Sequence, residues 1–224
     1  MRDKLRLRKR FRFRRREFDA NRRLYRAFPI LVHFNSANLV TTMGFVFGIF
    51  ACYFVMQLDM RMVVMCLFVA GVMDLADGYV AAKLNQQTEF GKHVDTLVDF
   101  FTCIIIPIWM VFALWRFAPF VFLPMLFYCI CGLWRLANYN VSGPGRTFRG
   151  LPVPGAMFMV VVAIWCVHMY EVPDAVASGM FVLVGLLMVS GVQLPKYGVW
   201  QIVMGFAGLG FLAAVLFHRQ PPFT

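Results

Sequence analysis

The chain has 224 residues, of which 61% are hydrophobic and 17% aromatic. A soluble domain is usually about 45–50% apolar, so this composition excludes an ordinary water-soluble fold. The formal net charge of +11 is concentrated at one end, because 13 of the 22 Lys and Arg residues lie in residues 1–26 and the remainder of the chain is close to neutral.

The basic segment opens the first predicted region, residues 1–35. Its stretch KLRLRKRFRFRRR mixes basic and apolar residues. This pattern fits a strand-like arm on an anionic lipid surface, a disordered arm, or a nucleic-acid contact, which an anchor in the bilayer disfavours. We expect a cytoplasmic arm that binds anionic lipids and no nucleic acid. The arm lacks the short apolar core and cleavage site of a signal peptide. Residues 17–34 predict a juxtamembrane amphipathic helix, and Asn35 and Ser36 are N-cap candidates for the next helix.

Seven apolar segments follow, each close to the 20 or so residues that cross a bilayer core of about 30 Å. They predict an all-α fold, a polytopic transmembrane helical bundle of six to seven spans over residues 36–217, with a short tail at 218–224. The seventh span is open to question because QLPKYGV at 193–199 could be a turn or a kink. The distribution of Lys and Arg between the loops predicts a cytoplasmic N-terminus, and we expect the plasma (inner) membrane. The segments are 38–57, 61–82, 92–115, 118–139, 153–170, 175–193 and 199–217.

Four aspartates interrupt the second and third apolar segments. An ionised Asp in hydrocarbon costs about 2.5–3.5 kcal/mol on insertion scales, so four of them point to a function. At about 100° per residue, each pair lies on one face of its helix together with small residues. The residues on these faces are Asp74, Asp77, Gly78 and Ala81 on the second segment, and Gly91, Asp95 and Asp99 on the third.

The two segments run in opposite directions, because only the short polar link LNQQTEF separates them. Four carboxylates can therefore face one another, and they repel unless cations lie between them. Oxygen ligands favour the hard divalent cations Mg²⁺ and Mn²⁺, which in turn bind phosphorylated substrates. The alternative is four aspartates that only solvate two helix ends and pair with Lys83, Lys92 or the basic arm.

The spacing from Asp74 to Asp99, D-x2-D-G-x2-A-A-x8-G-x3-D-x3-D, resembles the pattern of the CDP-alcohol phosphotransferase (CDP-alcohol phosphatidyltransferase) family. The family pattern differs at one position, where it has Arg and this chain has Ala82. Two further stretches, NLVTTMGFVFG and RLANYNVSGPGRTFRGLPVPGA (135–156), are similar to the phosphatidylserine synthase branch of that family. The resemblance covers residues 36–160.

The resemblance implies a transferase of phospholipid biosynthesis that moves a phosphatidyl group from CDP-diacylglycerol to an alcohol and releases CMP. It favours L-serine as the acceptor, and inositol phosphate, glycerol phosphate and choline are alternatives. It also implies two bound Mg²⁺ or Mn²⁺ ions and a homodimer. By the same resemblance, the metal ligands are Asp74, Asp77, Asp95 and Asp99, the catalytic general base is Asp99, and the substrate-binding residues are Gly78, Ala81, Lys83, Gly91, Arg135 and Arg149.

Two arginines of the family pattern are absent from this chain, at Ala82 and Asn138. Lys83 follows Ala82 but is rotated from it by about 100° on a helix, so its reach to the phosphates is an open question. These departures leave a second hypothesis, a membrane protein of the same fold that is catalytically impaired. A third is an intramembrane prenyltransferase, although that chemistry predicts aspartate motifs on two separate helix pairs rather than one cluster.

Overall fold

In the computed structural model of this chain, the described residues are 27–116, 118–142, 147–170, 172–195 and 199–217. Of these, only the backbone is described at residues 32, 142, 147–149, 193–195 and 199–206. The predicted basic arm, most of the predicted amphipathic helix at 17–34 and the tail at 218–224 lie outside the described residues.

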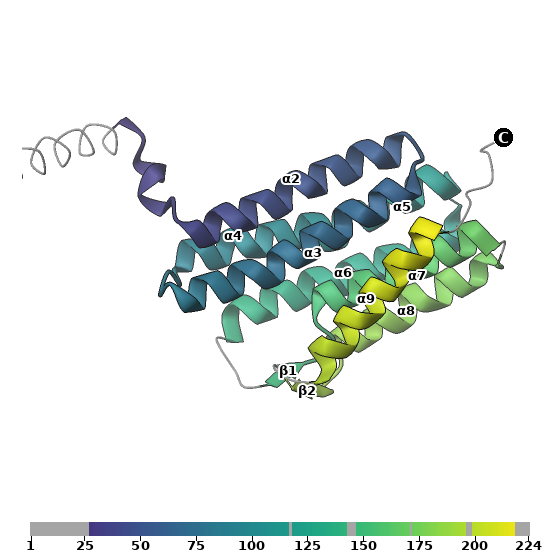
Figure 1. Cartoon of the computed structure of the whole chain (residues 1–224). Coiled ribbons are helices and arrows are strands. Elements are labelled where there is room, and N and C mark those ends of the chain that lie inside the picture. Colours follow the sequence, from purple (N-terminus) through teal and green to yellow (C-terminus); the bar gives the residue numbers. More distant parts are fainter. Residues whose placement is uncertain (1–26, 117, 143–146, 171, 196–198, 218–224) are drawn as a thin grey trace, which may run out of the picture.

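The described chain is helical except for one pair of three-residue strands, which confirms the predicted all-α bundle (Figure 1). The strands pair in antiparallel register, with Phe148 opposite Leu194. In chain order the elements are the 3-10 helix η1 (Pro29–His33), α2 (Ser36–Met56), α3 (Met60–Lys83), α4 (Glu89–Phe100), the π-helical turn η2 (Phe101–Ile105), α5 (Ile106–Trp115), α6 (Pro119–Ser142), β1 (Thr147–Arg149), α7 (Val153–Tyr170), α8 (Asp174–Val189), β2 (Gln193–Pro195) and α9 (Val199–Phe217).

Within the described part of the chain, five helical stretches are long and apolar enough to cross a membrane. They match the first five predicted spans, and α4, η2 and α5 together make the third. The last two predicted spans correspond to shorter apolar helices, which are the 16-residue α8 and the stretch Ala207–Phe217 of α9. Helix α8 ends at Val189 rather than at residue 193, because the backbone becomes extended at Ser190 and the chain turns into β2.

Polar side chains begin three of the membrane helices. Asn35 accepts a hydrogen bond from the backbone N–H of Asn38 at 2.8 Å, as predicted for the N-cap of α2. Asp59 and Thr88 accept equivalent hydrogen bonds at the starts of α3 and α4, at 3.2 and 3.0 Å. The first turn of a helix has N–H groups without intrahelical partners, so these side chains define where α2, α3 and α4 begin.

Two prolines lie inside membrane helices, and each leaves a backbone carbonyl without its helical partner. Pro107 follows η2, and the Cys103 carbonyl that it frees accepts a hydrogen bond from the buried Tyr128 hydroxyl of α6 at 2.8 Å. The carbonyl freed by Pro124 in α6 accepts in the same way from Ser178 Oγ of α8, at 2.9 Å. Hydroxyls from neighbouring helices therefore replace the missing backbone bonds and connect η2, α6 and α8.

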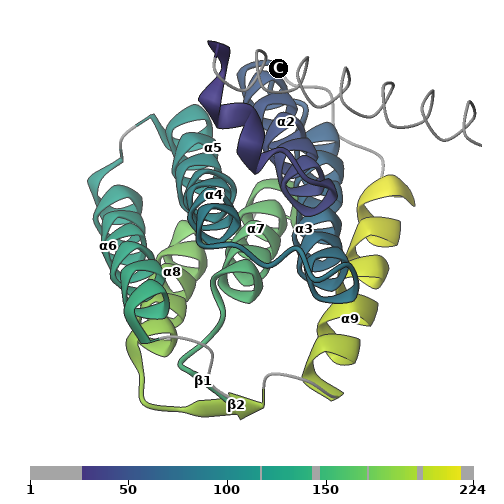
Figure 2. The same cartoon turned by 90° about the vertical axis from the view of Figure 1, so that its left-hand side faces the viewer.

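Small residues bring α2 close to its neighbours. A Cβ at Gly44 would lie 3.4 Å from Met73 Cβ of α3, and one at Gly48 would lie 3.0 Å from Thr102 Cγ2 of η2. This close approach uses the GxxxG spacing in the first span. Figure 2 looks along the bundle, with α7 in its middle and α9 at its edge beside α3. Helix α2 packs against α3 and against the third span, and α7 contacts both α3 and η2.

Candidate active site

Four aspartates from α3 and α4 line one small cavity, whose other walls come from α2, η2 and α7. Asp74, Asp95 and Asp99 each offer one carboxylate oxygen, and these three oxygens lie within 4.8 Å of one another. Asp77 lines the same cavity and is 7% exposed. The structure thus brings together all four aspartates that the sequence spacing singles out.

The link between α3 and α4 explains why the two pairs of aspartates face each other. Helix α3 ends at Lys83, and Asn85 adopts a left-handed φ of 53°, which Asn tolerates better than most residues. The Gln86 backbone N–H then donates to the Ala81 carbonyl at 2.9 Å, and Thr88 begins α4. This short link reverses the chain, and both helices pack against α2, so carboxylates spaced three and four residues apart line the same cavity.

Thr41 of α2 is a site residue that the sequence analysis does not identify. Its hydroxyl is hydrogen-bonded to a carboxylate oxygen of Asp77 and lies 3.2 Å from the Ala37 carbonyl. Thr41 is 5% exposed and lines the same cavity, so this hydroxyl helps to hold Asp77 in place. The sequence offers one weak signal, which is a hydroxyl inside an apolar span, where polar groups are usually functional or in helix contacts.

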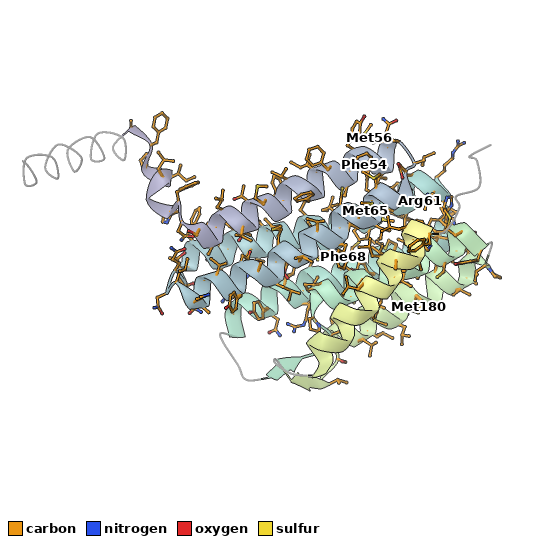
Figure 3. The ribbon with its side chains drawn as sticks, in the orientation of Figure 1. Phe54, Met56, Arg61, Met65, Phe68 and Met180 are labelled. Carbon is orange, nitrogen blue, oxygen red and sulfur yellow. The ribbon has the colours of Figure 1, made fainter. Side chains whose placement is uncertain are left out.

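A second, larger cavity of about 600 Å³ opens from the aspartates between α3, α6, α7 and α9. Asp74, Asp95 and Asp99 line one end of it, whereas most of its wall is apolar. Figure 3 labels Phe68, a member of this wall on the side of α3 that faces α9. Ligand sites are typically about 300–1,000 Å³ in volume. The shape and lining suit a molecule with a charged end and a long apolar end.

Arg135 of α6 lines the larger cavity together with the aspartates. Its side chain is 7% exposed, and its buried Nε atom has no hydrogen-bond partner among the described residues. A buried donor without a partner is costly, so this guanidinium indicates a ligand that completes its hydrogen bonds. Arginine binds phosphate and carboxylate groups through two parallel hydrogen bonds, so either group would fit.

The remaining residues predicted to bind substrate lie in different settings. Gly78 and Ala81 continue along α3 beyond the aspartates but line neither of the two cavities, and a Cβ at Gly78 would meet no atom within 4 Å. Gly91 packs against the start of α2, where a Cβ would lie 2.7 Å from Asn38 Oδ1. Arg149 lies in β1, where only its backbone is described.

The two lysines near the aspartates contact other groups. Lys83 is exposed, and its Nζ lies 5.5 Å from the centroid of the Tyr79 ring. Lys92 Nζ donates to the Asn140 backbone carbonyl at 2.8 Å, and Asn140 Nδ2 donates to Thr96 Oγ1 at 3.0 Å. These bonds tie α4 to the last turn of α6, where carbonyls lack helical partners. Neither lysine lines the cavities of the aspartates. The structure therefore does not support the alternative in which the aspartates form ion pairs with Lys83 or Lys92.

The FRGLPVP stretch brings the start of α7 to the site. Gly150 has a φ of 79°, and a Cβ there would lie 2.3 Å from the Met188 carbonyl oxygen of α8, so only glycine fits. The Gly150 N–H donates to the Val192 carbonyl at 2.6 Å. The loop is thereby docked on the end of α8, and Pro154, a few residues further on, forms part of both cavity walls.

A carboxylate cluster at one end of an apolar cavity, inside a bundle of membrane-spanning helices, defines a membrane protein built to act on an amphiphilic molecule. Residues 34–192 match the CDP-alcohol phosphatidyltransferase family, and the chain belongs to that family. This match confirms the resemblance seen in the aspartate spacing.

Curated relatives come from the phosphatidylserine synthase branch. The CDP-diacylglycerol–serine O-phosphatidyltransferase of Methanocaldococcus jannaschii is 28% identical over 131 residues, which are 58% of this chain and 62% of that protein, less than two thirds of its length. The protein of the same name from Bacillus subtilis is 28% identical over 162 residues, 71% of this chain and 89% of that protein.

A solved structure shares the fold. The phosphatidylinositol phosphate synthase of Mycobacterium tuberculosis, crystallised with CDP-DAG bound, matches with a TM-score of 0.55 and 13% sequence identity. The match covers 86% of this chain and 95% of that one. The helical arrangement is therefore that of a CDP-alcohol phosphotransferase.

Proposed function

We propose that this chain transfers the phosphatidyl group of CDP-diacylglycerol to L-serine and releases CMP. The observation that carries the proposal is a cluster of three carboxylates that shares one largely apolar cavity with Arg135, whose buried Nε has no hydrogen-bond partner among the described residues. The names of the curated relatives support serine as the acceptor. The CDP-DAG bound to the structural neighbour supports the donor.

The residues present fit a divalent metal ion. Asp74, Asp95 and Asp99 supply hard oxygen ligands from two helices, close enough together for one ion to contact all three. Asp77, hydrogen-bonded by Thr41, would complete a ligand set for two Mg²⁺ or Mn²⁺ ions. Without cations, carboxylates gathered in one small cavity repel one another. Such ions, when bound, neutralise charge on the diphosphate and on the departing CMP.

The transfer itself exchanges one bond at phosphorus, and side chains of this chain move the proton and bind the substrates. The serine hydroxyl oxygen forms a bond to the phosphorus that carries the diacylglycerol, and the bond from that phosphorus to the CMP oxygen breaks. Asp99 accepts the hydroxyl proton as the general base. Arg135 binds a phosphate oxygen or the serine carboxylate, and the apolar cavity holds lipid chains away from water.

The competing function is binding of CDP-diacylglycerol without turnover, and one observation favours it. The arginine of the family pattern is replaced by Ala82, and the neighbouring Lys83 lies outside both cavities. Arg135 would then have to supply the phosphate contact alone among the described side chains. Binding of the CDP-lipid without release of CMP would establish this second function.

The site is assigned to the cytoplasmic side of the plasma membrane. Helix η1 and the α3–α4 link lie at the same end of the bundle (Figure 1), and the Ala37 N–H donates to Gln86 Oε1 at 3.3 Å. The basic residues of 1–26 favour the cytoplasmic side and an anionic lipid surface. A cysteine placed at the exposed Gln87 should therefore react with an impermeant reagent from the cytoplasmic side only. Reaction from the opposite side alone would reverse the orientation.

The test of the activity is CMP release from CDP-dioleoylglycerol by the purified protein with Mn²⁺ or Mg²⁺. Separate reactions contain L-serine, glycerol phosphate, inositol phosphate or choline. We expect release with L-serine, and phosphatidylserine as the second product. Release with a different acceptor alone would keep the chemistry and replace the acceptor. No CMP with any acceptor, from protein that remains folded, would refute the proposed transferase.

A further inference from the structure

Helix α9 lies outside the segment that matches the family. The match ends at residue 192, whereas α9 begins at Val199. Figures 1 and 2 show α9 at the edge of the bundle beside α3, and it contacts both α3 and α7. Its residues Gly208, Leu209, Phe211 and Leu212 line the larger cavity. One wall of the cavity that contains the aspartates is thus built by a helix beyond the family segment.

Aromatic contacts hold α9 against α7. Phe211 packs edge-to-face on Phe158, with ring centroids 5.7 Å apart, and on Trp165, with centroids 6.2 Å apart. Val215, one turn further along α9, is fully buried. Edge-to-face aromatic pairs add to the stabilisation that burial provides, so this end of α9 has a defined position.

The contact of α9 with α3 depends on the absence of a side chain. Gly208 is buried, and a Cβ there would already lie 3.3 Å from the Phe68 ring. Both residues line the cavity, so a longer side chain at position 208 would press on Phe68 and take up cavity volume. Gly210 faces away from the bundle, because a Cβ there would meet no atom within 4 Å.

The occupant of this cavity has to suit both of its ends. The carboxylate cluster and Arg135 suit a metal-bound phosphate group, and the walls from α3, α7 and α9 suit hydrocarbon. A lipid with its phosphates at the aspartates would extend its chains along these helices. The continuity of the two ends in one cavity favours a phospholipid-type donor as the occupant over a separate apolar ligand.

We propose that α9 is a specificity-determining wall, which contacts an acyl chain of the lipid donor, and that Gly208 leaves the room that a long chain needs. This inference rests on the proposed function for the identity of the donor. It adds that a helix outside the family segment selects donors by chain length.

Two matched variants test this role, Gly208→Leu and Gly210→Leu. Both add the same side chain to the same helix, but only position 208 faces the cavity. CDP-dioleoylglycerol and CDP-dioctanoylglycerol serve as long-chain and short-chain donors. Crowding of a hydrophobic pocket by a few carbon atoms costs about tenfold or more, so Gly208→Leu should raise KM and lower kcat/KM by about tenfold for the long donor. The short donor should be turned over as by the wild type, and Gly210→Leu should change neither value.

Two outcomes of the kinetics would overturn the proposal. Equal losses on both donors in Gly208→Leu would indicate general damage, and no loss on either donor would show that α9 does not contact the lipid. A difference confined to the long donor supports the acyl-chain contact.

Photolabelling of the wild-type protein gives a measure that does not depend on turnover or on the folding of a variant. The probe is CDP-diacylglycerol with a diazirine near the end of one acyl chain, and we expect adducts on residues 207–217. Adducts there without CMP release would reject the proposed transferase and keep the acyl site. CMP release with adducts only on other helices would keep the transferase and reject the acyl site.

Discussion

The acidic end and the apolar end of the large cavity are built in different ways. The carboxylates come from two consecutive helices, α3 and α4, within the 26 residues from Asp74 to Asp99. The apolar wall combines parts of α3, α6, α7 and α9, which lie far apart in the sequence. The reacting end is therefore encoded locally by helical spacing, whereas the room for a lipid results from how distant helices pack.

The largest effect is expected at the acidic end. Asp95→Asn keeps the size of the side chain but removes the negative charge, and we expect the rate of CMP release to fall on the order of a thousandfold. Loss of a metal ligand removes several kcal/mol of transition-state stabilisation, and each 1.36 kcal/mol is about a factor of ten. Asp174→Asn at the start of α8 is the control and should keep the wild-type rate. Full activity of Asp95→Asn would separate the carboxylate cluster from the reaction.

Arg135 lines the same cavity as the aspartates, and its removal should have the next largest effect. A hydrogen bond to a charged group contributes about 1.5–3 kcal/mol, so Arg135→Met should lower kcat/KM about 10–100-fold. Lys83→Met should change it by about twofold at most, since surface substitutions usually have small effects. The measurement is kcat/KM for CDP-diacylglycerol and for serine. A larger loss in Lys83→Met than in Arg135→Met would make Lys83 the substitute for the missing arginine.

Thr41 tests whether the acidic end depends on a third helix. Thr41→Val keeps the shape but removes the hydroxyl bonded to Asp77. Partners of metal ligands typically change metal affinity about 10–100-fold, so the Mn²⁺ concentration for half-maximal activity should rise by about tenfold. Thr41→Ser should restore it. Thr42→Val is the matched control, because the Thr42 hydroxyl donates to the Asn38 backbone carbonyl at 2.7 Å. An unchanged Mn²⁺ dependence in Thr41→Val would remove Thr41 from the site.

The smallest effect is expected outside the cavity, at the hydrogen bond that joins α6 to η2. Tyr128→Phe removes the hydroxyl that bonds the Cys103 carbonyl. Hydrogen bonds between membrane helices contribute about 0.6 kcal/mol on average and about 1.7 at most, so the free energy of unfolding should fall by about 1 kcal/mol. A lower midpoint of thermal unfolding with kcat close to that of the wild type is the expected result. A large fall in kcat at unchanged stability would instead mean that this bond positions Asp99.

Helix positions were largely predictable, because a long apolar run is what a bilayer core requires. The errors fall at polar ends. The apolar pattern predicts the third span from residue 92, whereas α4 begins at Glu89 because Thr88 caps a polar first turn. The pairing of β1 with β2 was not predictable from local pattern, since the strands are three residues long and meet only after α7 and α8 have placed their ends.

In the candidate site, too, the features set by local spacing could be predicted and those set by packing could not. The shared faces of Asp74, Asp77, Asp95 and Asp99 could be predicted, because helical spacing is a local property. The role of Thr41 could not, since a threonine in α2 becomes informative only when its depth relative to α3 is known. The sequence also names Arg135 as a candidate, but its burial, and the lack of a hydrogen-bond partner for its Nε among the described residues, depend on packing between four helices.

The π turn η2 begins two residues after Asp99, and its extra residue changes the direction in which the later side chains of the span point. The Ile106 N–H donates to the Phe101 carbonyl, five residues back, where an α-helix would use four. In an uninterrupted α-helix, Val111 would be rotated by roughly 120° from Asp99. With the π turn, Val111 is fully buried and Trp109 is 42% exposed. Deleting one residue from 101–105 would rotate α4 relative to α5. Either the carboxylates of α4 or the buried apolar face of α5 would then turn toward the lipid.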